Sequence, residues 1–231
     1  MEEIHSLIKL AKDIKNSERW DNHNKQIEAL CNNPHDIEDW YIHVFAELTA
    51  NTFEEYLKLE KAYENQDMPE ICWRARNLLE LSIWSLYCVQ SNENAKQFYG
   101  DGGRDAMDLL KKLGAWDQKS GHSEQWEQKI EQSGSILKEF ADEMELGSFE
   151  ERYKSVNAAA KELGLELHYD TANKLLSKFI HPTALRVIGY FDENKIKDLK
   201  TGYFGQGCTS FAGAFNILEE HLINLLRNDN N

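Results

Sequence analysis

The stretch WRARNLLELSIWSLYC, residues 73–88, decides the fold class of this chain. At 100° of rotation per residue, apolar side chains cover one side of this segment, while two tryptophans and a tyrosine cover the opposite side. A helix that is apolar nearly all round is usually an interior helix. The pattern therefore predicts a central helix of an all-α protein, and it places Arg76 and Glu80 one turn apart among aromatic residues.

The rest of the chain predicts further helices. Asp67, Pro69 and Glu70 form a capping-box signature before the central helix. Convincing strand patterns are absent, since the best candidate, LELHY at residues 165–169, is too short to form a sheet alone. We therefore expect an all-α multi-helix bundle over residues 34–231. Residues 1–33 are expected to form an N-terminal helical arm that packs on the bundle or on a second copy.

Two glycine-rich segments predict breaks between helices. GDGGRD, residues 100–105, has the composition of a turn, although its backbone N–H groups could also cradle a phosphate. Three further glycines predict a loop over residues 192–208, followed by a final helix over residues 209–227. At the start of that helix, Cys208 is either a thiol of lowered pKa or, in the simpler interpretation, a packed side chain.

Composition limits the function classes. The net charge of −14 argues against extensive non-specific nucleic-acid binding, because that affinity comes from many Lys and Arg side chains. A local basic excess between residues 171 and 200 is either a solvated helix face or a small anion site. The four cysteines form no C-x-x-C pair, and no segment approaches the ~20 apolar residues of a membrane helix. We expect a cytoplasmic protein with no membrane segment, no cofactor and no metal.

Arg76 and Glu80 form the first candidate site. In a structural interpretation they are a buried salt bridge, and Asn77 and Tyr87 complete a hydrogen-bond network that fixes helix packing. In a functional interpretation the stripe lines a cleft, where Arg76 binds an anion and Glu80 orients the arginine or acts as a base. A buried pair predicts a loss of roughly 3–5 kcal/mol for Glu80→Ala, and an exposed pair predicts less than ~1 kcal/mol. Arg74 lies off the stripe, which suggests a surface position.

Three segments carry a resemblance to known proteins. They are RNLLELSIWSLYC at residues 76–88, Ser91–Tyr99 with Arg104-Asp105, and LLSKFIHPTAL at residues 175–185. Over roughly residues 70–190 the chain resembles a bacterial family of uncharacterised helical proteins with an Arg-x-x-x-Glu helix and a later Ser-x-Phe-x-His-Pro motif. That family looks distantly like the HEPN group of helical proteins, many of which cleave RNA without a metal or act as partners of nucleotidyltransferases and defence systems. The resemblance implies a helical bundle.

His181 is the candidate general acid or base. In the HEPN signature an arginine precedes a histidine by about five to seven positions on one helix, whereas here only Lys174 and Lys178 stand ahead of His181. Because His181 precedes Pro182, its backbone is biased away from the helical region and its ring is expected to project from a helix end. It either transfers a proton or caps the carbonyl groups of its own helix.

Two function classes follow from these residues. The first is a HEPN-like, metal-independent ribonuclease or nucleotide-phosphate-binding protein of a defence or stress system, with RNA or a nucleotide phosphate as its ligand. His181 would move a proton there, while Arg76 and Glu80 complete the catalytic site. The substrate-binding residues in this hypothesis are Lys174, Lys178, Asn77 and Tyr87. The second class is a non-enzymatic helical interaction module in which the same residues are structural. Such a module would form a homodimer or another homo-oligomer, or it would bind a different protein.

Overall fold

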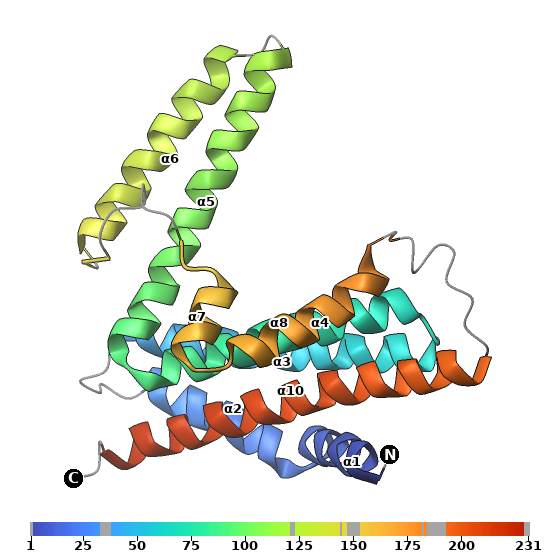
Figure 1. Ribbon diagram of the computed structural model, residues 1–231. Coiled ribbons are helices and arrows are strands. Elements are labelled where there is room, and N and C mark those ends of the chain that lie inside the picture. The colour runs from blue at the N-terminus through green and yellow to red at the C-terminus, as the bar shows by residue number, and fades with distance from the viewer. Residues whose placement is uncertain are drawn as a thin grey trace. The chain divides into compact units, whose positions relative to one another are not determined.

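The computed structural model describes residues 2–32, 38–120, 123–143, 145–146, 153–181, 183 and 193–228. This part of the chain contains nine α-helices and no strand (Figure 1). The helices are α1 (Glu2–Asn16), α2 (Glu18–Asn32), α3 (Asp39–Glu64), α4 (Met68–Gln90), α5 (Asn92–Ser120), α6 (Ser123–Glu143), α7 (Val156–Glu162), α8 (Glu166–Ile180) and α10 (Glu193–Asn228). The predicted all-α multi-helix bundle is confirmed. The HEPN-like relationship stays a prediction, as does the arm boundary between residues 33 and 34, which lies outside the described residues.

The chain divides into two compact units. Unit 1 comprises residues 1–90 and 156–231, and unit 2 comprises residues 91–155. Unit 1 therefore contains α1–α4, α7, α8 and α10, while unit 2 contains α5 and α6. Unit 2 is an insertion in the sequence of unit 1, which is built from two separate chain segments.

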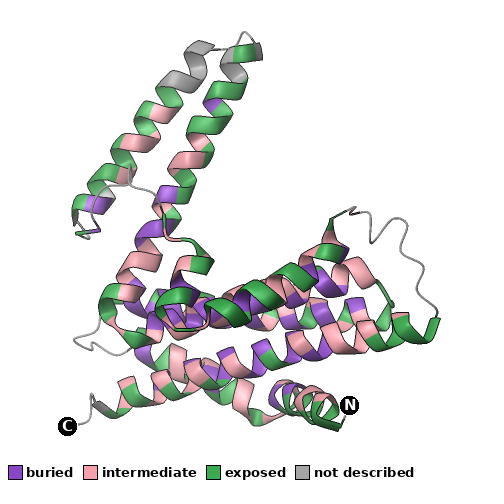
Figure 2. Cartoon of the chain, viewed as in Figure 1, coloured by how far each residue is buried: buried purple, intermediate pink, exposed green. Residues whose placement is uncertain are grey.

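The centre of unit 1 is formed by α4 and α10. α4 packs against α3, α8 and α10, and α10 also packs against α1 and α3. Figure 2 shows buried residues along the inner faces of these helices. On α4 they include Ile71, Ala75 and Leu78, none of which is exposed, and burial of a side chain such as Leu78 stabilises the fold by roughly 1.5–3 kcal/mol. The predicted cap is also present, because Asp67 Oδ1 accepts a hydrogen bond from the Glu70 N–H at 3.2 Å.

The prediction of a loop over residues 192–208 is wrong. α10 passes through this segment as one helix of 36 residues, which is about 54 Å long by helical rise. A Cβ atom on Gly205 would lie 2.6 Å from Ile4 Cγ2, and one on Gly207 would lie 3.2 Å from the Cα of Ala75. The glycines thus allow α10 to approach α1 and α4 closely, and this packing outweighs the low helix propensity of glycine.

The N-terminal helices α1 and α2 both pack against α10. Arg19 of α2 forms an ion pair with Glu219 of α10. On the side of α2 that meets α3, the Trp20 and Phe53 rings are stacked with their centroids 3.7 Å apart. The helices of the predicted arm therefore belong to unit 1 and contact its other helices through both polar and aromatic side chains.

His23 is a buried polar residue of α2. Its Nε2 lies 3.0 Å from Thr49 Oγ1 of α3, whereas its Nδ1 has no hydrogen-bond partner among the described residues. The ring packs on Phe215 of α10 with centroids 5.1 Å apart. Burial lowers the pKa of His23 to about 4; the Glu219 carboxylate opposes this shift and the Arg19 guanidinium adds to it. His23 is therefore neutral in the folded protein near pH 7.

In unit 2, α5 and α6 form an antiparallel hairpin. The direction follows from two contacts, because Gly114 packs against Ile130 and Gly134 packs against Met107. GDGGRD, which was predicted to be a turn, lies inside α5, a single helix of 29 residues. That prediction is wrong, and the backbone N–H groups of the segment belong to a helix rather than to a phosphate-binding turn.

A buried ion pair explains why this glycine-rich segment is helical. Arg104 Nη1 donates to Asp101 Oδ1 at 2.8 Å, and Arg104 Nη2 donates to the Leu146 carbonyl oxygen at 3.0 Å. The second oxygen of Asp101 accepts the backbone N–H of Lys154 at 3.0 Å. The side chains of Asp101 and Arg104 are 9% and 5% exposed. The pair therefore connects α5 to the chain that follows α6.

The segment LELHY, which was the best strand candidate, is also helical. α8 begins at Glu166, so that Leu167 is exposed and Tyr169 is buried on the inner side of the helix. The alternation of residues that suggested a strand is too short to be distinguished from the first turn of an amphipathic helix.

Candidate functional site

Arg76 and Glu80 form an ion pair on α4, with 3.0 Å between Arg76 Nε and Glu80 Oε1. Their side chains are 33% and 27% exposed, so the pair is partly buried. Tyr169 of α8 also donates a hydrogen bond to Glu80 Oε1, at 3.4 Å. Burial and the neighbouring Glu80 carboxylate raise the pKa of Tyr169 to about 12, which keeps the phenol protonated as a donor. The pair thus joins α4 to α8 at the protein surface.

A second polar cluster joins α3 to α4, with Glu55 of α3 at its centre. Glu55 accepts hydrogen bonds from Arg74 Nη1 and Asn77 Nδ2, each at 3.0 Å, and an ion pair from Lys58 at 3.1 Å. Burial opposes ionisation of Glu55, but the hydrogen bonds from Asn77, Arg74 and Lys58 hold its pKa below the ordinary value. Asn77 therefore belongs to a network with Glu55 instead of the predicted network with Glu80. Arg74, predicted to lie at the surface, is 21% exposed and ties α4 to α3.

These two clusters predict unequal costs of mutation. Glu55→Ala is expected to reduce the free energy of unfolding by about 2 kcal/mol, because it removes the carboxylate that accepts from Asn77 and leaves the partly buried Arg74 with only its second carboxylate, Glu70. Glu80→Ala is expected to cost only about 0.5–1 kcal/mol, since its pair with Arg76 is partly exposed to solvent. Urea denaturation of both variants measures the difference. A larger loss for Glu80→Ala would contradict the assignment.

Tyr87 lies in the core, with 2% of its surface exposed. Its ring meets Trp84 edge-on, with centroids 5.8 Å apart. Tyr87 is therefore a packing residue of α4 in this conformation, and contact with a substrate would require the core to open.

The structure places His181 at the C-terminal end of α8. Its φ of −86° and ψ of 154° are extended, which confirms the predicted effect of the following proline. The residue is exposed, and its backbone N–H donates to the Ser177 carbonyl oxygen at 3.4 Å. Lys174 and Lys178 are exposed on the same helix. All three candidates are accessible to solvent.

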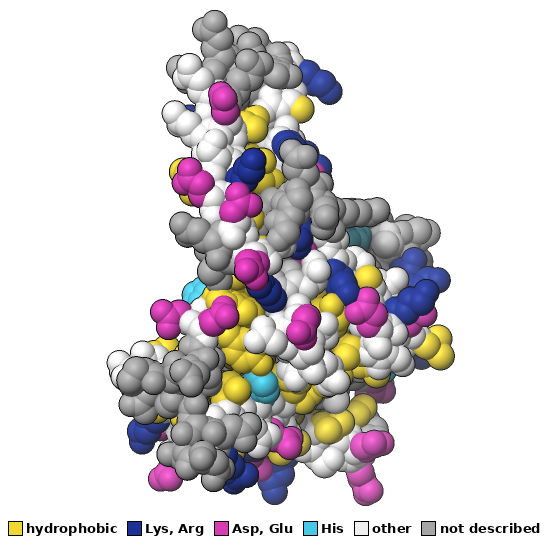
Figure 3. Space-filling view, turned by 90° about the vertical axis from the view of Figure 1, so that its left-hand side faces the viewer, with side chains coloured by type: hydrophobic (Ala, Val, Ile, Leu, Met, Phe, Trp, Pro, Cys, Tyr) yellow, Lys and Arg dark blue, Asp and Glu magenta, His cyan; other side chains and the backbone are white. Residues whose placement is uncertain are grey.

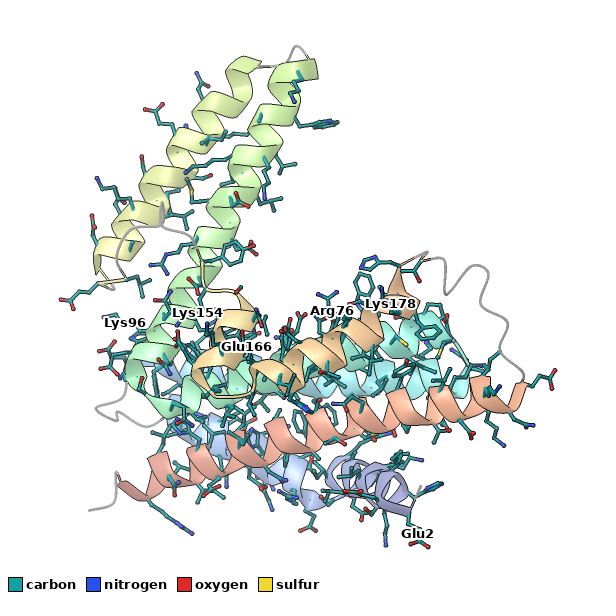
Figure 4. The ribbon with its side chains drawn as sticks, in the orientation of Figure 1. Glu2, Arg76, Lys96, Lys154, Glu166 and Lys178 are labelled. Carbon is teal, nitrogen blue, oxygen red and sulfur yellow. The ribbon has the colours of Figure 1, made fainter. Side chains whose placement is uncertain are left out.

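His181 lies far along α8 from the point where that helix contacts the Arg76–Glu80 pair of α4. Tyr169, which contacts Glu80, precedes His181 by twelve residues, or about 18 Å of helical rise. Figure 4 labels Arg76 on α4 and Lys178 near the C-terminal end of α8. Hydrogen bonds and ion pairs among the described residues give Arg76 only Glu80 as partner and join His181 only to its own chain neighbours. The predicted catalytic residues are therefore not brought together by these contacts.

A groove of about 660 Å³ runs between α8 and α10. Its apolar lining includes Leu175 and Leu176 from α8 and Leu199 and Tyr203 from α10. A Cβ atom added at Gly202, another lining residue, would meet nothing within 4 Å, so the groove is open at that point. No sequence pattern indicates an apolar groove here, because its lining comes from two different helices.

The buried thiol of Cys208 fits the packing interpretation. Burial raises its pKa to about 12, and the Glu60 carboxylate acts in the same direction. Cys208 lies in the interior of α10 and not at a helix N-terminus, because that helix begins at Glu193. The reactive-thiol alternative is therefore wrong.

Within the described ranges, no group of three or more His, Cys, Asp or Glu side chains is placed to hold a metal ion. No helix in these ranges combines the length and the apolar character that a membrane span requires.

Comparison with models of protein families shows which family the chain belongs to. A model of a protein family described as a family of unknown function, DUF5677, matches residues 43–198. The match includes the Arg76–Glu80 pair, all of the α5–α6 hairpin and His181. Comparisons with curated proteins and with solved structures found no match. Because the family model covers more than half of the chain, the protein belongs to the DUF5677 family of unknown function.

Proposed function

We propose that the protein is a non-enzymatic helical interaction module that binds an α-helical protein surface through the hairpin of unit 2. The observation that carries the proposal is an exposed apolar stripe on α5, formed by Ala106, Leu109, Leu113 and Trp116 and called the hairpin stripe below. Leu109, Leu113 and Trp116 are 58%, 37% and 69% exposed. Figure 3 shows hydrophobic side chains at the surface of the hairpin among acidic and basic ones.

The hairpin stripe is distinct from the face of α5 that packs on α6. That packed face contains Met107 and Gly114, whose helical positions lie about 130° away from those of the stripe. On α6, Ile136 is 67% exposed, and its helical position places it on the same side of the hairpin as the stripe. Among the described residues of unit 2, this side of the hairpin therefore carries exposed apolar side chains.

The spacing of the hairpin stripe favours a helix as the bound surface. Its members follow one another at intervals of three, four and three residues, the a and d spacing of a coiled-coil seam. Exposed apolar patches rimmed by charged residues are typical of protein–protein contact sites. The ribonuclease hypothesis has weaker support, because it needs His181 beside Arg76 and Glu80, and the described contacts of His181 are local to its own helix end.

An RNA-cleavage assay tests the non-enzymatic part of the proposal. We expect purified wild-type protein to leave single-stranded RNA oligonucleotides intact, at the same background level as His181→Ala. The control variant is His168→Ala, because His168 is exposed on the same helix and takes no part in the ribonuclease hypothesis. Cleavage by the wild type and His168→Ala that falls about 100-fold or more in His181→Ala would overturn the proposal in favour of a ribonuclease.

A further inference from the structure

Resting on the proposed function, we infer that the helical surface bound by the hairpin stripe is the stripe of a second copy of this chain, with the two α5 helices antiparallel. The order of residues in the stripe supports this occupant. When Leu109 lies opposite the partner's Leu113, Ala106 lies opposite the partner's Trp116, and each layer occurs twice by symmetry. The small Ala106 side chain leaves room for the large indole, so the layers alternate in size as a packed seam requires.

Charge along α5 supports the antiparallel direction. In this register residues 102–120 of the two copies lie side by side. Residues 102–110 contain two acidic residues and one basic residue, a net −1, while residues 112–120 contain two basic residues and one acidic residue, a net +1. Antiparallel helices place the acidic half of one copy beside the basic half of the other, whereas parallel helices would place like charges together. Asp105 and Lys119 flank the seam, and each comes to the level of the other residue in the second copy.

Charge on α6 indicates which helices form the seam. Residues 123–143 contain six acidic and two basic residues, a net −4. Two α6 helices placed side by side would repel each other, as would α6 beside the acidic half of α5. A central seam of two α5 helices avoids these contacts, and Ile136 lies on the correct side of the hairpin to add to its edge.

Sedimentation equilibrium of the full chain over a wide range of concentrations tests this surface. The wild type is expected to be a dimer, and Leu113→Lys is expected to raise the dissociation constant at least ~100-fold, because two unpaired charges would enter an apolar seam. Leu113 is 37% exposed within one copy, so the variant should fold, and Trp116→Lys is a second variant at a position that is 69% exposed. The matched control is Leu167→Lys, which replaces an 81% exposed leucine of α8 and should leave the dimer unchanged.

A charge exchange tests the direction of the helices. Asp105→Lys and Lys119→Asp should each weaken the dimer about 3- to 10-fold, and the double variant should regain wild-type affinity within about twofold. The inference is supported if Leu113→Lys or Trp116→Lys weakens the dimer, Leu167→Lys does not, and the double charge variant regains affinity. A wild type that is monomeric throughout overturns it, and so does a dimer insensitive to both stripe variants or to the charge exchange. These results are independent of RNA cleavage, which alone decides the non-enzymatic part of the proposed function.

Discussion

Asp101→Ala is expected to destabilise the α5–α6 hairpin by about 3–5 kcal/mol, because the substitution removes a buried carboxylate that pairs with the buried Arg104 charge. The hydrogen bond from Arg104 to the Leu146 carbonyl oxygen does not depend on Asp101, so the loss reports on the ion pair. The Lys154 N–H would also lose its acceptor. Hydrogen exchange of the α5 and α6 amides measures this loss within unit 2 alone, without assuming that the two units unfold together.

The control for Asp101→Ala is Asp108→Ala on the same helix. Asp108 pairs with Lys112 at i,i+4, but their side chains are 43% and 73% exposed. Its loss should therefore have little effect on the stability of the hairpin. Equal protection losses in the two variants would show that Asp101 and Arg104 contribute no more than a surface pair does.

Protonation of His23 is expected to lower the free energy of unfolding of unit 1 by about 3 kcal/mol as the pH decreases from 6.5 to 4. Above pH 6.5 the side chain is neutral in both the folded and the unfolded chain, so its titration has no effect on stability. Between the two pKa values the unfolded chain binds a proton that folded His23 cannot accept, and this favours unfolding. Below about pH 4 both forms are protonated and the loss is complete.

Urea denaturation of wild type and His23→Gln at several pH values isolates this contribution. The glutamine variant should lose less stability between pH 6.5 and 4, because it lacks the His23 imidazole. His221, whose pKa burial also lowers, is present in both proteins and does not contribute to the difference. His168→Gln, at an exposed position, is the matched control for removal of a histidine. Parallel curves for wild type and His23→Gln would refute the assignment of this pH dependence to His23.

The helices that the sequence predicts well are those with a long apolar period. α4 shows its period over six turns and has a recognisable cap at Asp67, so its type and its start follow from local information. Glycine occurs both in turns and where helices approach closely, and local sequence does not distinguish the two cases. The turns predicted at residues 100–105 and 202–207 are wrong for this reason. In the first segment the Arg104–Asp101 pair favours a continuous helix, and in the second the close contacts with Ile4 and Ala75 do so.

The candidate site was predictable only within one helix. The Arg76–Glu80 pair follows from i,i+4 spacing on α4. Glu55 and Tyr169, which determine the surroundings of the α4 polar residues, come from α3 and α8 and have no spacing relationship to Arg76. The burial of His23 likewise depends on the packing of α2 between other helices, which hydrophobic periodicity within α2 does not indicate.

The ion pair between Arg19 and Glu219 joins residues that are 200 positions apart, and this separation has a consequence for the order in which the nascent chain folds. A ribosome that adds roughly 5–20 residues per second completes α4 about 7–28 s before it completes α10. During that interval the faces of α3 and α4 that α10 will cover have no permanent partner, and they are a natural site for chaperone binding. The contacts within the hairpin are nearer in sequence, so unit 2 can form while synthesis continues.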